Sequence, residues 1–123
     1  MFLLDSDIII YTTKPEFDFL GQFLERKSFG VSIISFVEVM GYHKISEKDK
    51  AELTDFFEST KIHAISNHIA NKAIELRQQR KMKLGDALIA ATALALDCPL
   101  VTNNSKDFTW IDSIELIDPL ENK

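Results

Sequence analysis

Short apolar runs alternate with longer amphipathic stretches along most of the chain. Apolar runs bounded by polar or turn residues predict five strands, at residues 2–4, 30–34, 61–65, 99–102 and 114–117. Helical spacing of apolar residues predicts helices over 16–27, 35–44, 67–82 and 86–97, with another after Ser46 and a turn or short helix over 8–11. Strands that alternate with helices are joined by right-handed crossovers. We therefore predict an α/β fold, a three-layer α/β/α sandwich around a central, mainly parallel five-stranded sheet.

The composition is that of one globular domain. The chain has 123 residues, 46% of them hydrophobic, which is enough for a single core, and we expect one domain over residues 1–123. Asp5 and Asp7 interrupt the apolar start, and no run approaches the ~20 apolar residues of a membrane span. We therefore expect a soluble, cytoplasmic protein without a signal peptide. The single cysteine, Cys98, is interpreted as a small core residue.

Three acidic residues lie where a predicted strand or turn passes into a helix. They are Asp5, Glu38 and Asp86. Because active groups gather outside the carboxyl ends of parallel strands, we expect these side chains to meet at one edge of the sheet. Hard divalent cations bind carboxylate oxygens, and no cluster of His or Cys competes for that role. The pattern therefore predicts a site for Mg²⁺ or Mn²⁺.

Each acid also has a structural interpretation that the sequence leaves open. Ser35-x-x-Glu38 matches a capping box, in which the glutamate only reaches back to the helix start. Asp7 is interpreted as the N-cap of residues 8–11, and Asp86 could complement the positive end of its own helix. Asp97 is excluded from the site because eleven residues of helix place it ~16 Å from Asp86.

Four sequence blocks carry a family resemblance, in order and over nearly the full length. They are Leu4-Asp5-Ser6-Asp7-Ile8, Ser35-x-x-Glu38-Val39, the run from Asp86 to Ala93, and Leu100-Val101-Thr102-Asn103-Asn104-x-x-Asp107-Phe108. The chain resembles PIN-domain proteins of the VapC type, the ribonuclease toxins of bacterial and archaeal toxin–antitoxin pairs. The resemblance implies a PIN-like fold and a metal-dependent endoribonuclease with Asp5, Glu38 and Asp86 as its catalytic, metal-binding acids. It also implies neutralisation by a cognate VapB-like antitoxin.

The resemblance places further residues around these acids. The fourth acidic position of the family falls at Asn104, an amide, and Asp107 lies three residues further on. Asp107 is a candidate for a water-mediated contact or for fixing its loop. Ser6 and Thr102 are candidates for hydrogen bonds that orient the acids.

An RNA substrate requires a local source of positive charge. The net charge of −5 argues against broad attraction to nucleic acid. The densest basic run is Arg77, Arg80, Lys81 and Lys83, which could guide an RNA backbone toward Asp86. Alternatively, these cations complement the dipole of a helix C-terminus. The histidines His43, His63 and His68 show no ligand spacing, and Trp110 and the nine phenylalanines are interpreted mainly as core residues.

The helix predicted at residues 16–27 has an unusually broad apolar face. It carries Phe17, Phe19, Leu20, Phe23 and Leu24, more than one core-facing stripe needs. We expect part of this face to be exposed and to form a groove for the antitoxin, the alternative being an ordinary core. We also expect a homodimer or a higher toxin–antitoxin assembly.

Two other functions are compatible with parts of the sequence. Asp5-x-Asp7 after an apolar strand resembles the nucleophile motif of haloacid-dehalogenase-like phosphatases, but Gly85-Asp86 is followed by Ala90 where that family has an acid. The other is a non-catalytic PIN-like module that binds RNA or protein, which the amide at Asn104 and the acidic net charge would suit.

Overall fold

The computed structural model describes residues 1–121, which form one parallel sheet between two helical layers. The sheet has the order β3-β2-β1-β4-β5, and every neighbouring pair is parallel. The strands are β1 (Phe2–Leu4), β2 (Phe29–Ser32), β3 (Lys61–His63), β4 (Leu100–Val101) and β5 (Leu116–Ile117).

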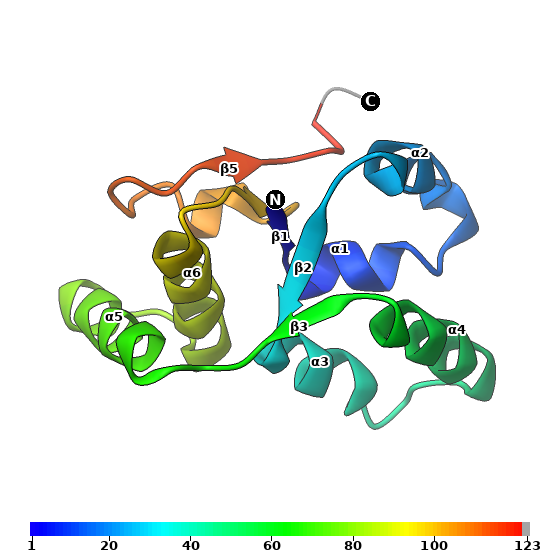
Figure 1. Ribbon diagram of the computed structural model, residues 1–123, viewed down its shortest axis with the longest axis horizontal. Helices are drawn as coiled ribbons and strands as arrows, with labels where there is room; N and C mark the ends of the chain where they lie inside the picture. Colours follow the sequence, from blue (N-terminus) through cyan, green and yellow to red (C-terminus); the bar gives the residue numbers. More distant parts are fainter. Residues whose placement is uncertain (122–123) are drawn as a thin grey trace.

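Helices cover both faces of the sheet, as predicted. Helices α5 and α6 lie on one side of the strands and α1 to α4 on the other (Figure 1). The helices are α1 (Ser6–Tyr11), α2 (Phe19–Glu25), α3 (Ile33–Met40), α4 (Glu47–Glu58), α5 (Asn67–Gln79) and α6 (Leu84–Leu96), with 3-10 turns at Pro15–Phe17 and Ser105–Asp107. The predicted three-layer sandwich is therefore confirmed, with a sheet that is wholly parallel.

Two apolar cores hold the layers together. Because successive strand side chains point to opposite faces, Leu3 and Leu100 are buried against α5 and α6, whereas Leu4 and Val101 are buried under α1 to α4. Burial on both faces explains why the strands are continuous apolar runs rather than alternating ones. Cys98 packs half-buried against the first core, as expected.

The strand order reverses at the centre of the sheet, beside β1. The chain runs from β1 to β2 and β3 in one direction, and then crosses back through α5 and α6 to β4 on the other side of β1. In parallel α/β sheets, the point where the order reverses is where ligands bind, outside the carboxyl ends of the strands. Asp5 follows β1 at that point.

The broad apolar helix predicted at residues 16–27 is shorter, and its exposed groove is not observed. After the turn at Pro15–Phe17, helix α2 spans only Phe19–Glu25. Phe17 stacks on Tyr11 with 4.3 Å between ring centroids, and the rings of Phe23 and Phe2 are 6.5 Å apart. The rings thus cover one another. The exposed large apolar side chains of residues 1–121 are instead Met1, Ile10, Val37, Tyr42, Ile74 and Leu84.

Several element boundaries differ from the predicted ones. Strand β2 ends at Ser32, not at residue 34, because the Ser32 side chain accepts a hydrogen bond from the Ile34 N–H and caps α3. Helix α3 ends before Gly41 rather than at residue 44, and α5 ends at Gln79 rather than 82. No helix within residues 1–121 is both long enough and apolar enough to cross a membrane.

Candidate active site

Asp5 is the buried centre of the site. Its Oδ1 accepts a hydrogen bond from the Ser6 N–H at 2.8 Å, which makes it the N-cap of α1. Its Oδ2 accepts one from the Thr102 hydroxyl, also at 2.8 Å, at the end of β4. Only 6% of the residue is exposed. Burial, with the nearby negative charge of Asp7, raises the pKa of Asp5 to about 7.

Asp7 does not cap the helix, so that prediction is wrong: Asp5 occupies the position. The Asp7 carboxylate accepts hydrogen bonds from the Ile8 N–H at 2.7 Å and the Asn103 N–H at 3.0 Å. It thereby ties the start of α1 to the segment that follows β4. Burial raises the pKa of Asp7, and the charge of Asp118 adds to the effect.

Glu38 is held by a chain of hydroxyl groups. The Ser6 Oγ lies 2.7 Å from the Glu38 Oε1 and 2.9 Å from the Ser35 Oγ. Because an ionised carboxylate only accepts hydrogen bonds, Ser6 donates to Glu38 and accepts from Ser35. The capping-box alternative for Ser35 and Glu38 is therefore not observed, because Ser32 caps α3 and Ser35 is buried inside the helix.

Asp86 lies in the first turn of α6, beside Glu38. A Cβ atom on Gly85 would lie 2.6 Å from the Glu38 Oε2, so the glycine allows the carboxylate to approach the start of this helix. Burial raises the pKa of Asp86; the charge of Lys83 opposes this rise, and the charges of Asp107 and Glu38 add to it. The charge of Asp86 also raises the pKa of Asp5. The three predicted acids are thus electrostatically coupled.

The remaining candidates take different positions. Thr102 is fully buried and accepts a hydrogen bond from the Asn104 N–H at 3.0 Å while donating to Asp5. Asn104 contributes this backbone group and is otherwise exposed. Asp107 ends the turn Ser105–Asp107 and faces a cavity that Asp86 also lines. The orienting role predicted for Ser6 and Thr102 fits these hydrogen bonds.

The donor set suits a hard divalent cation. Within residues 1–121, no three His, Cys, Asp or Glu side chains are close enough together to hold a metal as they stand. The acids that converge nevertheless present only carboxylate oxygens, the ligands that Mg²⁺ and Mn²⁺ prefer. Mutual repulsion contributes to the raised pKa values of Asp5 and Asp86, and a cation would relieve it.

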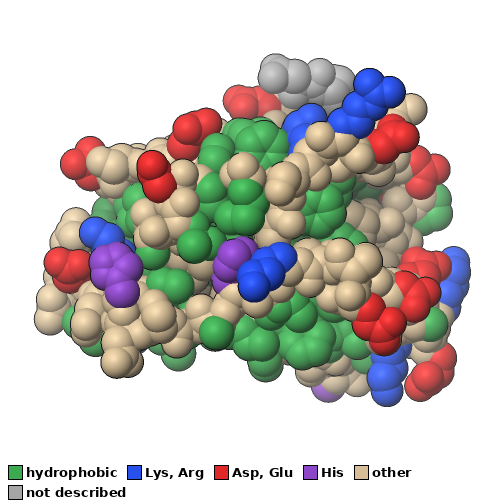
Figure 2. Space-filling view, viewed as in Figure 1, with side chains coloured by type: hydrophobic (Ala, Val, Ile, Leu, Met, Phe, Trp, Pro, Cys, Tyr) green, Lys and Arg blue, Asp and Glu red, His purple; other side chains and the backbone are tan. Residues whose placement is uncertain are grey.

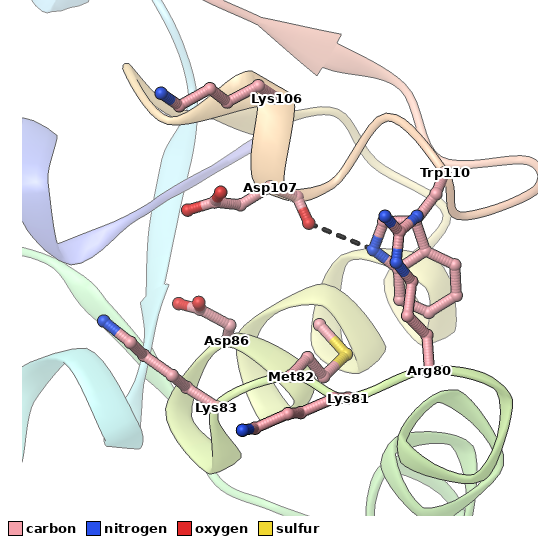
Figure 3. Close-up of a pocket in the computed structure, with 8 residues that line it drawn as sticks. All are labelled: Arg80, Lys81, Met82, Lys83, Asp86, Lys106, Asp107 and Trp110. Atoms are coloured by element: carbon pink, nitrogen blue, oxygen red, sulfur yellow. Dashed lines mark hydrogen bonds between the residues drawn. The ribbon is translucent and has the colours of Figure 1, made fainter.

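A cavity of about 250 Å³ adjoins Asp86 (Figure 3). It is lined by Arg80, Lys81, Met82, Lys83, Asp86, Lys106, Asp107 and Trp110. Three members of the predicted RNA-binding run are therefore beside the acids, whereas Arg77 lines a neighbouring depression on α5. Sequence reasoning missed Lys106 and Trp110. The signal was present, since a lysine and an aromatic residue flank Asp107 within a few residues.

The sequence matches the PIN domain family model over residues 2–112. The chain belongs to the PIN domain family. A search of curated proteins found no match. Among solved structures, the chain is similar to a toxin–antitoxin complex from Klebsiella pneumoniae, with 32% identity, a TM-score of 0.80, and coverage of 97% of this chain and 98% of that one.

Two further structures show the same fold at lower identity. DNA-bound VapBC from Salmonella typhimurium has a TM-score of 0.84 at 22% identity, covering 95% of this chain and 96% of that one. VapBC2 from Rickettsia felis, bound to a promoter DNA fragment, has a TM-score of 0.79 at 24% identity, covering 94% of this chain and 96% of that one. The resemblance to VapC-type PIN proteins is confirmed, and the phosphatase alternative is not supported.

Proposed function

We propose that this PIN-domain protein is a Mg²⁺- or Mn²⁺-dependent endoribonuclease toxin of the VapC type, which hydrolyses RNA phosphodiester bonds. The observation that carries the proposal is the convergence of Asp5, Glu38 and Asp86 at the carboxyl end of β1. These acids come from three distant segments, and their charges interact. The charge of Asp86 raises the pKa of Asp5 and that of Glu38 raises the pKa of Asp86, an arrangement that is more typical of functional sites than of groups placed only for stability.

In this proposal Asp5 and Asp86 hold the metal, and Glu38 assists them or orients the attacking water. A bound divalent cation supplies an activated water, stabilises charge on the phosphate and assists the departing oxygen. The protein holds the acids in place for that chemistry. Thr102 and the Ser6 N–H fix the two oxygens of Asp5, and the hydroxyl chain from Ser35 through Ser6 fixes Glu38.

Asp86→Asn tests the nuclease assignment. Removing a hydrogen-bond partner of a metal ligand typically lowers activity about 10- to 100-fold. Loss of a ligand should therefore reduce cleavage of a labelled RNA in Mg²⁺ or Mn²⁺ by more than about 100-fold. The matched control is Asp97→Asn at the other end of α6. Asp97 is exposed and has a φ of 51°, a left-handed conformation that asparagine adopts readily.

Retention of cleavage by a folded Asp86→Asn variant would remove Asp86 from the site. Absence of cleavage by the wild-type protein in either metal, together with RNA binding, would favour the non-catalytic PIN-like module. Mapping the 5′ ends of cleaved cellular RNA after brief induction would identify the substrate.

A VapB-like antitoxin is the partner that this proposal requires. The similar structure from Klebsiella pneumoniae is a toxin–antitoxin complex. On this chain, a depression of about 400 Å³ between α1 and the α3–α4 region is lined mostly by apolar surface, with Ile10 39% and Tyr42 54% exposed. Tyr42→Arg should leave RNA cleavage intact and weaken inhibition by the antitoxin. Homodimerisation remains a prediction, which sedimentation of the purified chain would test.

A further inference from the structure

The cavity beside Asp86 has two chemically different ends. The carboxylates of Asp86 and Asp107 point toward one end, and Arg80 lies over Trp110 at the other, with lysines above and below (Figure 3). The Arg80 guanidinium carbon is 5.5 Å from the centre of the indole ring. The cavity thus connects the candidate metal-binding acids to a stacked pair of planar groups.

Within residues 1–121, none of the cations around this cavity forms an ion pair within 4.0 Å, although the charge of Lys83 acts on Asp86. Within residues 1–121, the one ion pair within 4.0 Å joins Lys48 and Glu52 on α4. Helix dipoles explain only part of the cluster, because Arg80 is the C-cap residue of α5 and is favoured there whereas Lys83 is not. Arg77 lies in the last turn of α5, where a cation is favoured, but Lys83 is the N-cap residue of α6, where a positive charge opposes the dipole. In a chain of net charge −5, these unpaired cations indicate an anionic ligand.

The Arg80–Trp110 pair provides a flat surface for stacking. The Trp110 Nε1–H donates a hydrogen bond to the Asp107 backbone carbonyl at 3.1 Å, which fixes the indole, and one indole face is covered by Arg80. Arg80 itself is exposed. A guanidinium held in this way leaves its outer face free for a nucleobase, and single-stranded RNA is commonly held by stacking on aromatic rings and on arginine planes.

We propose that this cavity binds the nucleotide next to the scissile phosphate of a single-stranded RNA. Its base stacks on the Arg80–Trp110 pair, and its phosphates lie among Lys81, Lys83 and Lys106. Placing the phosphates at the end of the cavity near Asp86 rests on the proposed nuclease function. At about 250 Å³ the cavity is smaller than the ~300 to 1,000 Å³ of sites for drug-sized ligands, so it is suited to no more than a single nucleotide.

The chain contains its own reporter for this binding, because Trp110 is its single tryptophan. The probe is a mixed-sequence, single-stranded RNA hexamer in EDTA, where no cleavage occurs. We expect the hexamer to quench Trp110 fluorescence. Arg80→Gln should weaken binding of the fluorescein-labelled hexamer, followed by anisotropy, about 5- to 100-fold. Arg26→Gln, which removes the same charge from the exposed end of α2, is the matched control and should bind as the wild type does.

Three further variants separate stacking from charge. Trp110→Phe retains an aromatic ring and should bind more tightly than Trp110→Leu when both are folded. Lys106→Gln should lower affinity for all sequences and reduce the salt dependence of binding by about one unit of slope. Equal binding by wild type, Arg80→Gln and Arg26→Gln, or the absence of quenching, would overturn the proposal.

Failure of this proposal is distinguishable from failure of the nuclease assignment. If Asp86→Asn abolishes cleavage but Arg80→Gln neither weakens binding nor slows cleavage, the nuclease function stands and the nucleotide subsite does not. If the hexamer quenches Trp110 and Arg80→Gln weakens binding while the wild type cleaves no RNA, the subsite stands and the nuclease assignment does not.

Discussion

Asp5→Asn should stabilise the metal-free protein at alkaline pH. The buried carboxylate has its pKa raised from an ordinary 3.8 to about 7. At about 1.4 kcal/mol per pH unit, this interval corresponds to about 4 kcal/mol of destabilisation once Asp5 ionises. Asparagine removes the charge and keeps the acceptor for the Ser6 N–H, but it alters the hydrogen bond from Thr102, which contributes about 1 kcal/mol. We expect a net gain of about 2 to 3 kcal/mol at pH 8.

The gain should depend on pH with a defined sign. Because folding raises the pKa of Asp5, the wild-type protein has the full stability from this group below about pH 4 and loses it as pH rises to about 7. The variant has no such titration. The difference between the two proteins should therefore be near zero at pH 4.5 and largest at pH 8.

Urea unfolding in EDTA, followed by Trp110 fluorescence, measures this difference. A gain of about 2 kcal/mol moves the midpoint by about 1 M for a domain of this size. Asp55→Asn, which changes an exposed carboxylate on α4, is the control and should be nearly neutral at both pH values. A variant no more stable than wild type at pH 8, or one with equal gains at pH 4.5 and pH 8, would refute the reasoning.

Three further predictions concern the same site. Gly85→Ala should displace Glu38, whose Oε2 lies 2.6 Å from the added carbon, and lower RNA cleavage about 10-fold or more. The urea midpoint should not fall, because alanine is favoured over glycine in a helix; normal cleavage would show that Glu38 is dispensable or freely repositioned. Thr102→Val removes the hydrogen bond that lowers the pKa of Asp5, so the pH profile of cleavage should move to higher pH, and an unmoved profile would contradict this. Saturating Mn²⁺ should raise thermal stability, by about 2.7 kcal/mol at a hundred times its dissociation constant. The increase should be smaller at pH 5 than at pH 7.5, because protons compete with the metal for the carboxylates. Calorimetry that shows no increase at pH 7.5 would argue against metal binding at this site.

The overall fold was predictable because its determinants are local. Apolar runs and helical spacing determine strands and helices within a few residues. The parallel direction of the strands follows from the helices that connect them. The errors lie where one side chain decides a boundary. Ile33 and Ile34 favour a strand by type, but the Ser32 hydroxyl bonds to the Ile34 N–H and starts a helix there. Likewise, Phe17 packs on Tyr11 and Phe23 packs on Phe2, contacts that no local pattern shows.

That Asp5, Glu38 and Asp86 lie near one another was predictable from their places where a strand or turn passes into a helix, but their surroundings were not. The role of Ser35 depends on Ser6, 29 residues away, and a local capping motif concealed it. Trp110 packs, partly buried, against the first core, as predicted, but its neighbours in sequence do not show that Arg80, from the end of α5, lies over it. These contacts join segments that are far apart in the chain, so local sequence patterns do not show them.

The hydrogen bond between Asp5 and Thr102 also orders events during synthesis. The two residues are 97 positions apart. A ribosome that adds about 5 to 20 residues per second makes the second one about 5 to 20 s after the first. Until then β1 has its acid but lacks the neighbouring strand that orients it. If Asp5 is a catalytic acid, as proposed, the nascent chain lacks the complete site until synthesis is nearly finished, and an antitoxin translated first can be folded before the site forms.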